Sequence, residues 1–426
     1  MKKIAFITPH YYPSTLTGSG IVVMNLAEEF AKLGHDVSVI TSNALTTRYS
    51  YNPIFGKKIE KRYETHNKVK IYRLSCYQLY SSIGLILLKL FGKFLPKKFI
   101  DHLKIISNGP YLIGLDRILI SHDYDVIHCS PSPLAINKQV ITILSKMIEK
   151  PKLIFTPFFH SQLSDFANLE LKKIFQSADI IHVITNTEKN EISTRFSINV
   201  KKIIVVPLFL NTSNMQTIDY LKKDIMLFKE KYDLTDKKII LFAGIKGTAK
   251  GAIDLLLSIN MLHKTNPEYI LIAIGTDTKE WKKVKKKIDK NCLLDLNYVD
   301  TEVKEIVFAS CDIFCLPSRS ETFGLVYLEA WHKKKPVIAV STEAVKEFIG
   351  DSGIFVEFGN TQDIIKAIKL IISSKSVAKE LGEKGFNKLM KSYTFSKVFP
   401  EYLTLFAGDR KTFFWIQNNK KLFSDF

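Results

Sequence analysis

Long apolar runs and paired cysteines are both missing from this chain. No stretch reaches the roughly 18–20 uninterrupted apolar residues that a membrane-spanning helix needs. The 426 residues include only five cysteines, an odd number, and no two have the C-x-x-C spacing of a zinc site. Four of the five stand in apolar, strand-like surroundings, which predicts buried free thiols and a reducing cytoplasm. The opening MKKIAFITPHYYP does not resemble a secretory leader, because its short apolar core soon meets Pro9.

Acidic residues are few relative to basic ones. The chain has 42 Asp and Glu against 61 Lys and Arg, a net charge of +19. This excess predicts attraction to an anionic partner, which could be a phosphorylated ligand, acidic lipid or nucleic acid. No nucleic-acid-binding module is recognisable, and the lysine-rich residues 279–290 fit a solvated helix face, so we expect no nucleic-acid partner. The length and the apolar fraction of 46% predict two globular domains.

Strand-like and helical patterns alternate along both halves of the chain, which predicts parallel sheets. In the first half, strand patterns at residues 3–8 and 36–41 flank a helical pattern at 21–33. A second series begins at residues 238–243. We therefore predict an α/β fold of two doubly wound, Rossmann-like domains. The expected parts are residues 1–210, residues 211–395, and a C-terminal helix and tail, 396–426, that packs back on the first domain.

Residues 83–106 interrupt this rhythm with an apolar segment that contains lysines. Lys89 and Lys93 are one helical turn apart, beside Leu90 and Phe94. A proline inside the segment is expected to divide it into two helices. Two interpretations remain open: an amphipathic element that lies on an anionic membrane surface, or an excursion packed on the first domain near an acceptor site.

The stretch SRSETFGLVYLEA, residues 318–330, follows a predicted strand and enters a predicted helix. Free backbone N–H groups and the helix dipole favour phosphate at such a helix start. Glu321 on the turn and Glu329 on the helix can accept hydrogen bonds from hydroxyl groups on either side of that phosphate. A phosphate flanked by hydroxyls describes a nucleotide sugar, although glutamates near helix starts are also common on solvated surfaces.

Three further loops contain residues suited to the same ligand. Gly18 and Gly20 would let a phosphate or sugar approach backbone N–H groups, although a simple loop turn fits equally well. Lys250, in a glycine-bearing loop before a helix, can neutralise a diphosphate or can be solvated. His160 follows a strand of the first domain, where open α/β sheets bind ligands, and is either a sugar ligand or a structural loop histidine.

Taken together, several segments resemble the retaining GT-B glycosyltransferases of family four (glycosyl transferases group 1). The resemblance covers nearly the whole chain, apart from a region at 45–120 and the tail. It implies an α/β GT-B fold with two Rossmann-like domains facing a cleft, and a retaining, metal-independent glycosyltransferase of the hexosyltransferase type. The matching segments are GSG, LAEEFAKLGHDVSVIT, the AKG loop, SADIIHVIT, ASCDIFCLPSRSETFGLVYLEAWHKKKPVIA and DSGIFVEFGN.

The resemblance also implies a role for individual residues. Glu321 and His160 would contact the donor sugar, and Lys250 would neutralise the leaving phosphates, so these three are the expected catalytic residues. Retention would follow front-face displacement, without Glu321 as a covalent nucleophile. Glu329 would hold the ribose, and the base would lie near Tyr298. The expected donor-binding residues are Gly18, Gly20, Lys246, Tyr298, Val299, Thr322, Phe323, Gly324, Leu325 and Glu329.

The family's usual arginine in the first loop of the second domain is replaced here by Ile245. Either Lys246 substitutes for it, or Lys250 acts with less help. No metal and no cofactor are expected besides the nucleotide-sugar donor. The implied function is transfer to a saccharide or lipid-linked acceptor in cell-surface polysaccharide or lipopolysaccharide biosynthesis, in the cytoplasm at the inner face of the membrane. A GT-B sugar-nucleotide epimerase and a non-catalytic nucleotide-sugar-binding protein remain as alternatives.

Overall fold

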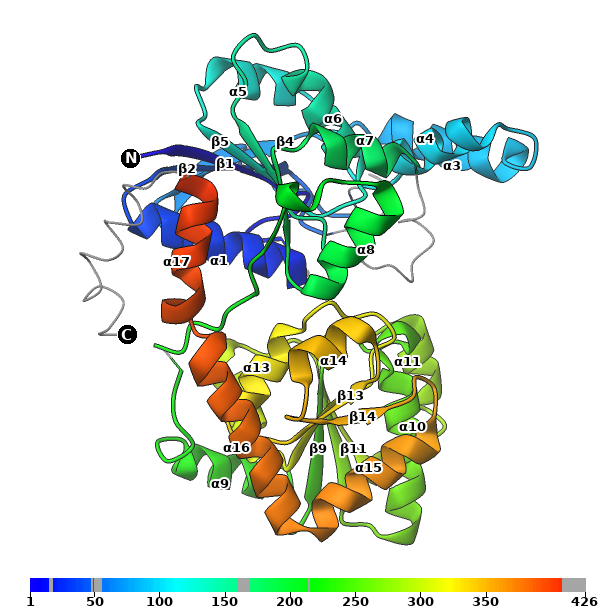
Figure 1. Cartoon of the computed structure of the whole chain (residues 1–426). Coiled ribbons are helices and arrows are strands. Elements are labelled where there is room, and N and C mark those ends of the chain that lie inside the picture. The colour runs from blue at the N-terminus through cyan, green and yellow to red at the C-terminus, as the bar shows by residue number, and fades with distance from the viewer. Residues whose placement is uncertain (15–17, 47–48, 50–55, 160–168, 214, 408–426) are drawn as a thin grey trace. The chain divides into compact units, whose positions relative to one another are not determined.

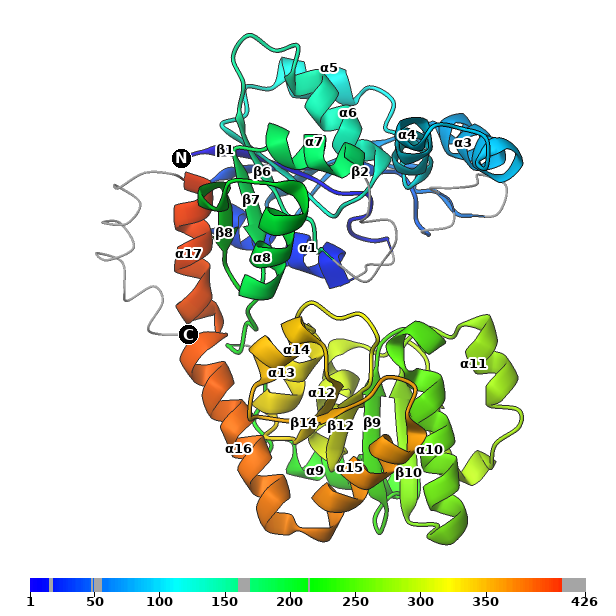
Figure 2. The same cartoon turned by 45° about the vertical axis from the view of Figure 1, so that its right-hand side comes forward.

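The computed structural model describes residues 1–14, 18–46, 49, 56–159, 169–213 and 215–407. The chain forms two compact units, Met1–Val206 together with residues 404–407, and Pro207–Leu403. In each unit helices cover a mostly parallel sheet (Figures 1 and 2). The predicted α/β class with two Rossmann-like units is therefore confirmed. The units separate after Val206 rather than at residue 210, and the predicted packing of the tail stays a prediction for residues 408–426, which lie outside the described part.

The sheet of the first unit has eight strands in the order β3-β4-β2-β1-β5-β6-β7-β8. Its pairings are parallel except for that between β3 and β4. The strand order reverses between β1 and β5, and open sheets bind ligands beyond the carboxyl ends of the strands at such a reversal. The strands are Lys3–Ile7 (β1), Asp36–Ser42 (β2), Tyr63–His66 (β3), Val69–Leu74 (β4), Val126–Cys129 (β5), Lys152–Phe155 (β6), Ile180–Val183 (β7) and Ile203–Val205 (β8).

The first helix begins earlier than its sequence pattern indicates. It starts at Gly18, so Gly18 and Gly20 lie in its first turn and not in a preceding loop. Pro96 divides the apolar segment into two helices, as predicted. The helices of this unit are Gly18–Lys32 (α1), Gln78–Phe91 (α3), Lys97–Ser107 (α4), Leu115–Ser121 (α5), Ala135–Leu144 (α6), Leu169–Ser177 (α7) and Asn186–Phe196 (α8).

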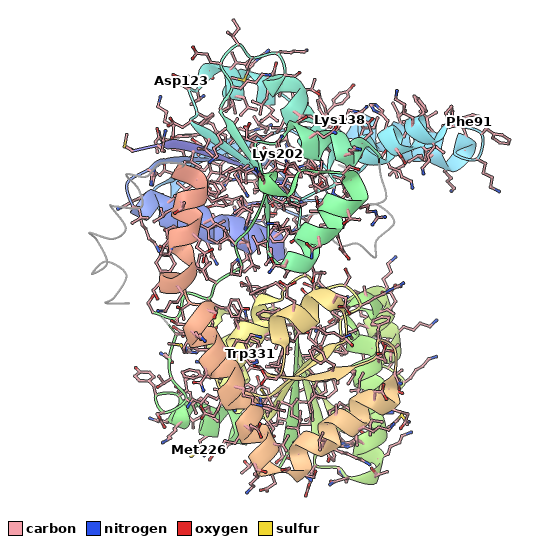
Figure 3. All side chains as sticks on the ribbon, viewed as in Figure 1. Phe91, Asp123, Lys138, Lys202, Met226 and Trp331 are labelled. Carbon is pink, nitrogen blue, oxygen red and sulfur yellow. The ribbon has the colours of Figure 1, made fainter. Side chains whose placement is uncertain are left out.

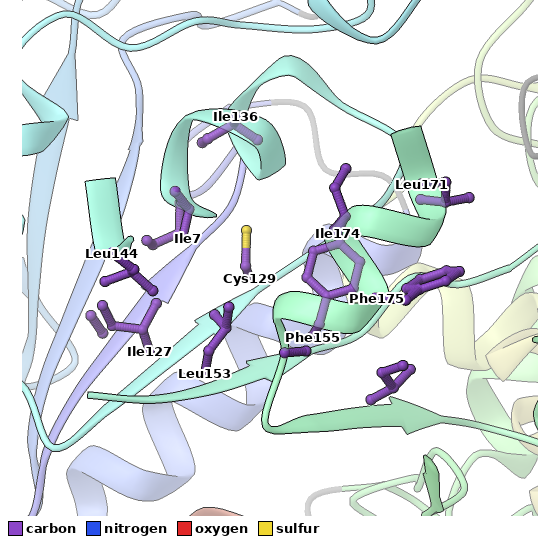
Figure 4. Close-up of a cluster of buried hydrophobic side chains, with 14 of the residues drawn as sticks. Ile7, Ile127, Cys129, Ile136, Leu144, Leu153, Phe155, Leu171, Ile174 and Phe175 are labelled. Atoms are coloured by element: carbon purple, nitrogen blue, oxygen red, sulfur yellow. The ribbon is translucent and has the colours of Figure 1, made fainter. Parts of the chain in front are cut away.

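A core of apolar side chains fills the space between the first sheet and the helices on one of its faces (Figure 4). Ile7, Ile127 and Phe155 come from the strands, and Ile136 and Phe175 come from the helices α6 and α7. Removing this apolar surface from water stabilises the unit by about 25 cal/mol per Å². The cysteines follow the prediction: all five are free, and those at 129, 292, 311 and 315 are buried.

A row of hydrogen-bonded polar side chains crosses the same sheet at β5, β6 and β7. His128 Nε2 lies 2.7 Å from Thr156 Oγ1, which lies 2.8 Å from His182 Nδ1. His182 Nε2 then donates to the carbonyl oxygen of Val206 at 2.9 Å. Burial, with a smaller contribution from His182, lowers the pKa of His128 to about 3, and burial lowers the pKa of His182 to about 4. Both imidazoles are therefore neutral in the folded unit at neutral pH.

This pair of histidines predicts that the first unit loses stability in mild acid. In the unfolded chain both imidazoles titrate near ~6.5, so below that pH the unfolded state binds more protons than the folded state. The stabilisation is present above the unfolded pKa and is lost as the pH falls toward 4, with a loss of about 2 kcal/mol per histidine at pH ~5. Urea unfolding of the full chain between neutral pH and pH ~5 measures it. A variant with His182→Asn should show a shallower pH dependence, and stability independent of pH over this range would contradict the prediction.

The second sheet has six parallel strands in the order β11-β10-β9-β12-β13-β14. The strand order reverses between β9 and β12, and residues 404–407 at the end of α17 belong to the first unit. The strands are Lys238–Ala243 (β9), Tyr269–Ile274 (β10), Leu293–Leu296 (β11), Ile313–Leu316 (β12), Val337–Val340 (β13) and Ile354–Val356 (β14). The helices are Lys222–Lys231 (α9), Ala252–Thr265 (α10), Lys279–Val284 (α11), Thr301–Ser310 (α12), Leu325–His332 (α13), Glu343–Ile349 (α14), Thr361–Ser373 (α15), Lys375–Ser392 (α16) and Phe395–Ala407 (α17).

Among the helices described, none is both long enough and apolar enough to cross a membrane.

Candidate functional site

The loops that follow β9 and β12 lie against each other where the strand order of the second sheet reverses. The backbone N–H of Arg319 donates to the carbonyl oxygen of Ala249 at 3.0 Å. Gly251 has a φ of +69°, and a Cβ atom at this position would lie 2.0 Å from the carbonyl oxygen of Pro317. Only glycine permits so close an approach in this backbone conformation. The two loops therefore form one element at the edge where parallel sheets bind ligands.

This approach brings together two of the predicted catalytic residues, Lys250 and Glu321. The Nζ atom of Lys250 lies 2.6 Å from Oε2 of Glu321, a charge-assisted hydrogen bond. The side chains are 33% and 16% exposed, so both remain open in part to a ligand. A cation and a carboxylate thus stand side by side at the reversal of the sheet.

The start of α13 adjoins this pair and is fixed by its neighbours. Gly324, the residue before the helix, has a φ of +84°, and a Cβ atom there would lie 2.8 Å from the ring of Tyr327. The hydroxyl of Tyr327 donates to the carbonyl oxygen of Leu316 at 2.9 Å, which ties the helix to β12. The buried ring of Phe323 packs on Phe348 with centroids 4.0 Å apart. Phe323 can therefore offer a ligand only its backbone, while first-turn N–H groups of a helix lack intrahelical partners and favour an anion.

Glu329 lies further along α13 and has a different partner from Glu321. Its Oε1 atom accepts a hydrogen bond from Nζ of Lys304 on α12 at 2.5 Å. Its Oε2 atom is buried and has no hydrogen-bond partner among the described residues. Sequence reasoning missed Lys304, because one lysine in an amphipathic helical pattern carries no sign that it meets a carboxylate on another helix. Thr322 and Leu325, on either side of Phe323 and Gly324, are partly buried.

Lys246 belongs to a separate, buried cluster of charges. Its ammonium group is fully buried, 2.7 Å from Oδ1 of Asp277 and 2.5 Å from Oδ1 of Asp295. Burial acts to raise the pKa of Asp295, but hydrogen bonds from Lys246 and Lys285 outweigh it and hold that pKa below its usual value. This geometry argues against the predicted role of Lys246 in donor binding. It also leaves Ile245, which is 53% exposed, without a substitute cation from the next residue.

Four of the remaining predicted residues belong to other elements of the chain. Tyr298, which is 90% exposed, and Val299 follow β11 at the edge of the second sheet. Gly18 and Gly20 belong to the first unit, where Gly20 is buried within α1. The predicted ligand His160 lies outside the described residues. The donor-site prediction therefore rests on the loops after β9 and β12 and on α13.

Comparison with known proteins identifies the family. The profile of the glycosyl transferases group 1 matches residues 224–388, and that of glycosyltransferase family 4 matches residues 16–214. Together they span most of the chain, which belongs to the group 1 glycosyltransferases. As the resemblance in the sequence implies, the two Rossmann-like units are those of the GT-B fold.

Individual relatives are distant. The chain is 30% identical to the lipopolysaccharide core biosynthesis glycosyltransferase LpsE of Rhizobium meliloti, over 24% of this chain and 30% of that protein. Sucrose-phosphate synthase from Thermosynechococcus elongatus has a similar structure, with a TM-score of 0.71 at 16% identity over 100% of both chains. Anabaena HepE in complex with UDP-glucose gives a TM-score of 0.63 at 14% identity, over 93% of this chain and 97% of that one. The first curated relatives are matched over only 30% to 61% of their own length.

Proposed function

We propose that this protein transfers a sugar from a nucleotide-sugar donor to a saccharide or lipid-linked acceptor in cell-surface glycan biosynthesis. The observation that carries the proposal is the Lys250–Glu321 pair beside the start of α13 at the reversal of the second sheet. Membership of the group 1 glycosyltransferases supports it, as does the name of the LpsE relative.

In this proposal Lys250 and Glu321 have different roles toward the donor. The ammonium of Lys250 and the N–H groups of α13 would neutralise the diphosphate as it leaves, which is charge stabilisation by groups already in place. These positive groups would do so without a metal ion. Glu321 would accept hydrogen bonds from hydroxyls of the donor sugar. We further propose that transfer retains the anomeric configuration by front-face displacement, with the leaving phosphate taking the acceptor's proton. Glu321, which is paired with Lys250, is not assigned as a covalent nucleophile.

Polar groups at the reversal of the first sheet support a hydroxyl-rich acceptor. The hydroxyl oxygens of Thr8, Ser130 and Ser132, just beyond β1 and β5, are buried and have no hydrogen-bond partner among the described residues. An unpaired buried polar group costs about 1–3 kcal/mol. Water or a polyhydroxylated ligand would supply the missing partners. A saccharide, or the sugar part of a lipid-linked acceptor, fits this requirement.

A screen of nucleotide sugars by thermal shift tests the donor, since a ligand at 100 times its Kd stabilises the folded state by about 2.7 kcal/mol. The stabilising donor is then incubated with saccharide acceptors in the presence of EDTA, and the anomeric configuration of the product is read by NMR. We expect transfer with retention and no effect of EDTA. Binding without transfer would indicate a non-catalytic binder. Formation of an epimerised donor in the absence of acceptor would indicate an epimerase. A product with inverted anomeric configuration would contradict retention.

Lys304 is expected to raise the affinity for the donor through its contact with Glu329. Lys304 donates a hydrogen bond to Oε1 of Glu329. Oε2 of Glu329, which has no partner among the residues that the structure describes, is then left to accept a hydrogen bond from the ribose hydroxyls. Replacing Lys304 with methionine should raise the donor KM roughly tenfold, with kcat changed much less, because a hydrogen bond to a charged group is worth about 1.5–3 kcal/mol. Steady-state kinetics measures the split. A Lys304→Arg variant, which keeps the ion pair, is the control, and an unchanged KM in Lys304→Met would contradict this role.

A further inference from the structure

We propose that the hairpin formed by α3 and α4 docks the protein on the surface of an anionic lipid bilayer. The hairpin extends from the body of the first unit, with Phe91 at its outer end (Figures 1 and 3). The proposal concerns where the protein acts and does not depend on the proposed transfer, so the two can fail separately.

The outer part of the hairpin exposes large apolar side chains. Leu90 is 63% exposed, Phe91 50% and Phe94 85%. Ile83 and Ile86 precede Leu90 at helical spacing on one face of α3, and each is more than half exposed. A gathering of apolar side chains at one place on a surface marks an interaction site rather than the scattered exposure found on any protein.

The exposed charges of the hairpin are all positive. Within residues 78–107 the sequence has one acidic residue, Asp101, and its side chain is buried. Four lysines around the turn are exposed, and none forms an ion pair with a described residue; they are Lys89, Lys93, Lys97 and Lys98. Anionic headgroups above a hydrocarbon layer complement this combination, because the lysines meet the headgroups while the apolar tip enters the layer beneath. Nucleic acid offers the negative charge but no apolar layer for the tip.

The base of the hairpin is anchored, so the tip is presented by a fixed element. Gly84 of α3 packs so closely on α4 that a Cβ atom there would lie 2.0 Å from Oγ of Ser107. Leu103 and Ile105 of α4 are buried, and α4 packs against α6 and α7. An element that is buried at one end and apolar and basic at the other is suited to peripheral binding.

Flotation of the full chain with lipid vesicles tests the proposal. Vesicles of phosphatidylglycerol with phosphatidylcholine are compared with vesicles of phosphatidylcholine alone, at low and at high salt. We expect binding to the anionic vesicles that weakens as salt is added. One variant, Lys89→Gln with Lys93→Gln, Lys97→Gln and Lys98→Gln, should lose on the order of 100-fold in partitioning. A second, Leu90→Ser with Phe91→Ser and Phe94→Ser, should lose at least about tenfold.

The second unit provides a control with the same change in charge. Four lysines in and after α11 are exposed, and no exposed large apolar side chain occurs within the described residues 279–290; the lysines are Lys282, Lys283, Lys286 and Lys287. Replacing these four with glutamine should change partitioning by less than about threefold, since they lie outside the hairpin. An equal loss in this control would assign binding to net charge and overturn the proposal. Unchanged partitioning of both hairpin variants would also overturn the proposal. A third contrary outcome is a dimer in size-exclusion chromatography that the serine variant converts to a monomer while vesicle binding stays the same. In that case a second copy of the chain would occupy the tip.

Discussion

Replacing Glu321 with glutamine is expected to lower the rate of sugar transfer by at least about 10²–10³-fold, the usual cost of removing one preorganised group that acts in the transition state. The substitution keeps the shape of the side chain but removes the charge that holds Lys250 2.6 Å away. The hydrogen bonds from the donor sugar would lose their charge assistance, and the lysine would lose the carboxylate that positions it. The measurement is kcat/KM for the donor found by the thermal-shift screen.

Two further variants make this result specific. Glu343→Gln removes an exposed carboxylate on α14 of the same unit, and we expect it to leave the rate within about twofold of the wild type. Lys250→Met should cost about as much as Glu321→Gln, and the double variant little more than either, because residues that act as one unit are not additive. Transfer retained by Glu321→Gln would remove the basis of the assigned site.

Replacing Lys246 with methionine is expected to lower the free energy of unfolding of the second unit by about 3–5 kcal/mol. The fully buried ammonium group of Lys246 lies between Asp277 and Asp295, and its removal leaves two largely buried carboxylates to share Lys285. A matched substitution at the exposed Lys283 should cost less than about 0.5 kcal/mol. Chemical denaturation of the three proteins measures the difference.

The same variant separates two roles for Lys246. If Lys246 binds the donor phosphates, its substitution should lower the affinity for the donor and change the free energy of unfolding little. If Lys246 instead holds the loops after β9 and β10 together, its substitution should mainly lower the free energy of unfolding. A stable Lys246→Met variant with a strongly raised donor KM would restore the sequence-based prediction for this residue and contradict the structural role.

The architecture was predictable because it depends on local patterns. Buried strands, helical periodicity and the spacing between them are properties of short segments, and they predicted two doubly wound units. The same holds for α13, whose start follows from the glycine and polar residues between a strand and an apolar run. Boundaries were predicted less well: α1 begins at Gly18, three residues before the predicted start at residue 21, although glycine is a weak helix former.

The pairing of charges was not predictable in the same way. Lys250 and Glu321 are separated by 71 residues, and only the adjacency of β9 and β12 brings their loops together. Lys304 meets Glu329 because α12 packs beside α13. Lys246 stands four positions before Lys250 in the same glycine-bearing loop, yet one side chain turns into the unit and the other stays partly exposed.

The sequence by itself determined the two α/β units, the free cysteines, the division of the apolar segment at Pro96 and the resemblance to the group 1 glycosyltransferases. Tertiary structure alone decided which lysine pairs with Glu321, which one is buried with two aspartates, and that the tip of the α3–α4 hairpin stays exposed. The physical reason is that periodicity and composition describe a segment's own preferences, whereas the partner of a charge depends on how strands and helices distant in sequence pack together.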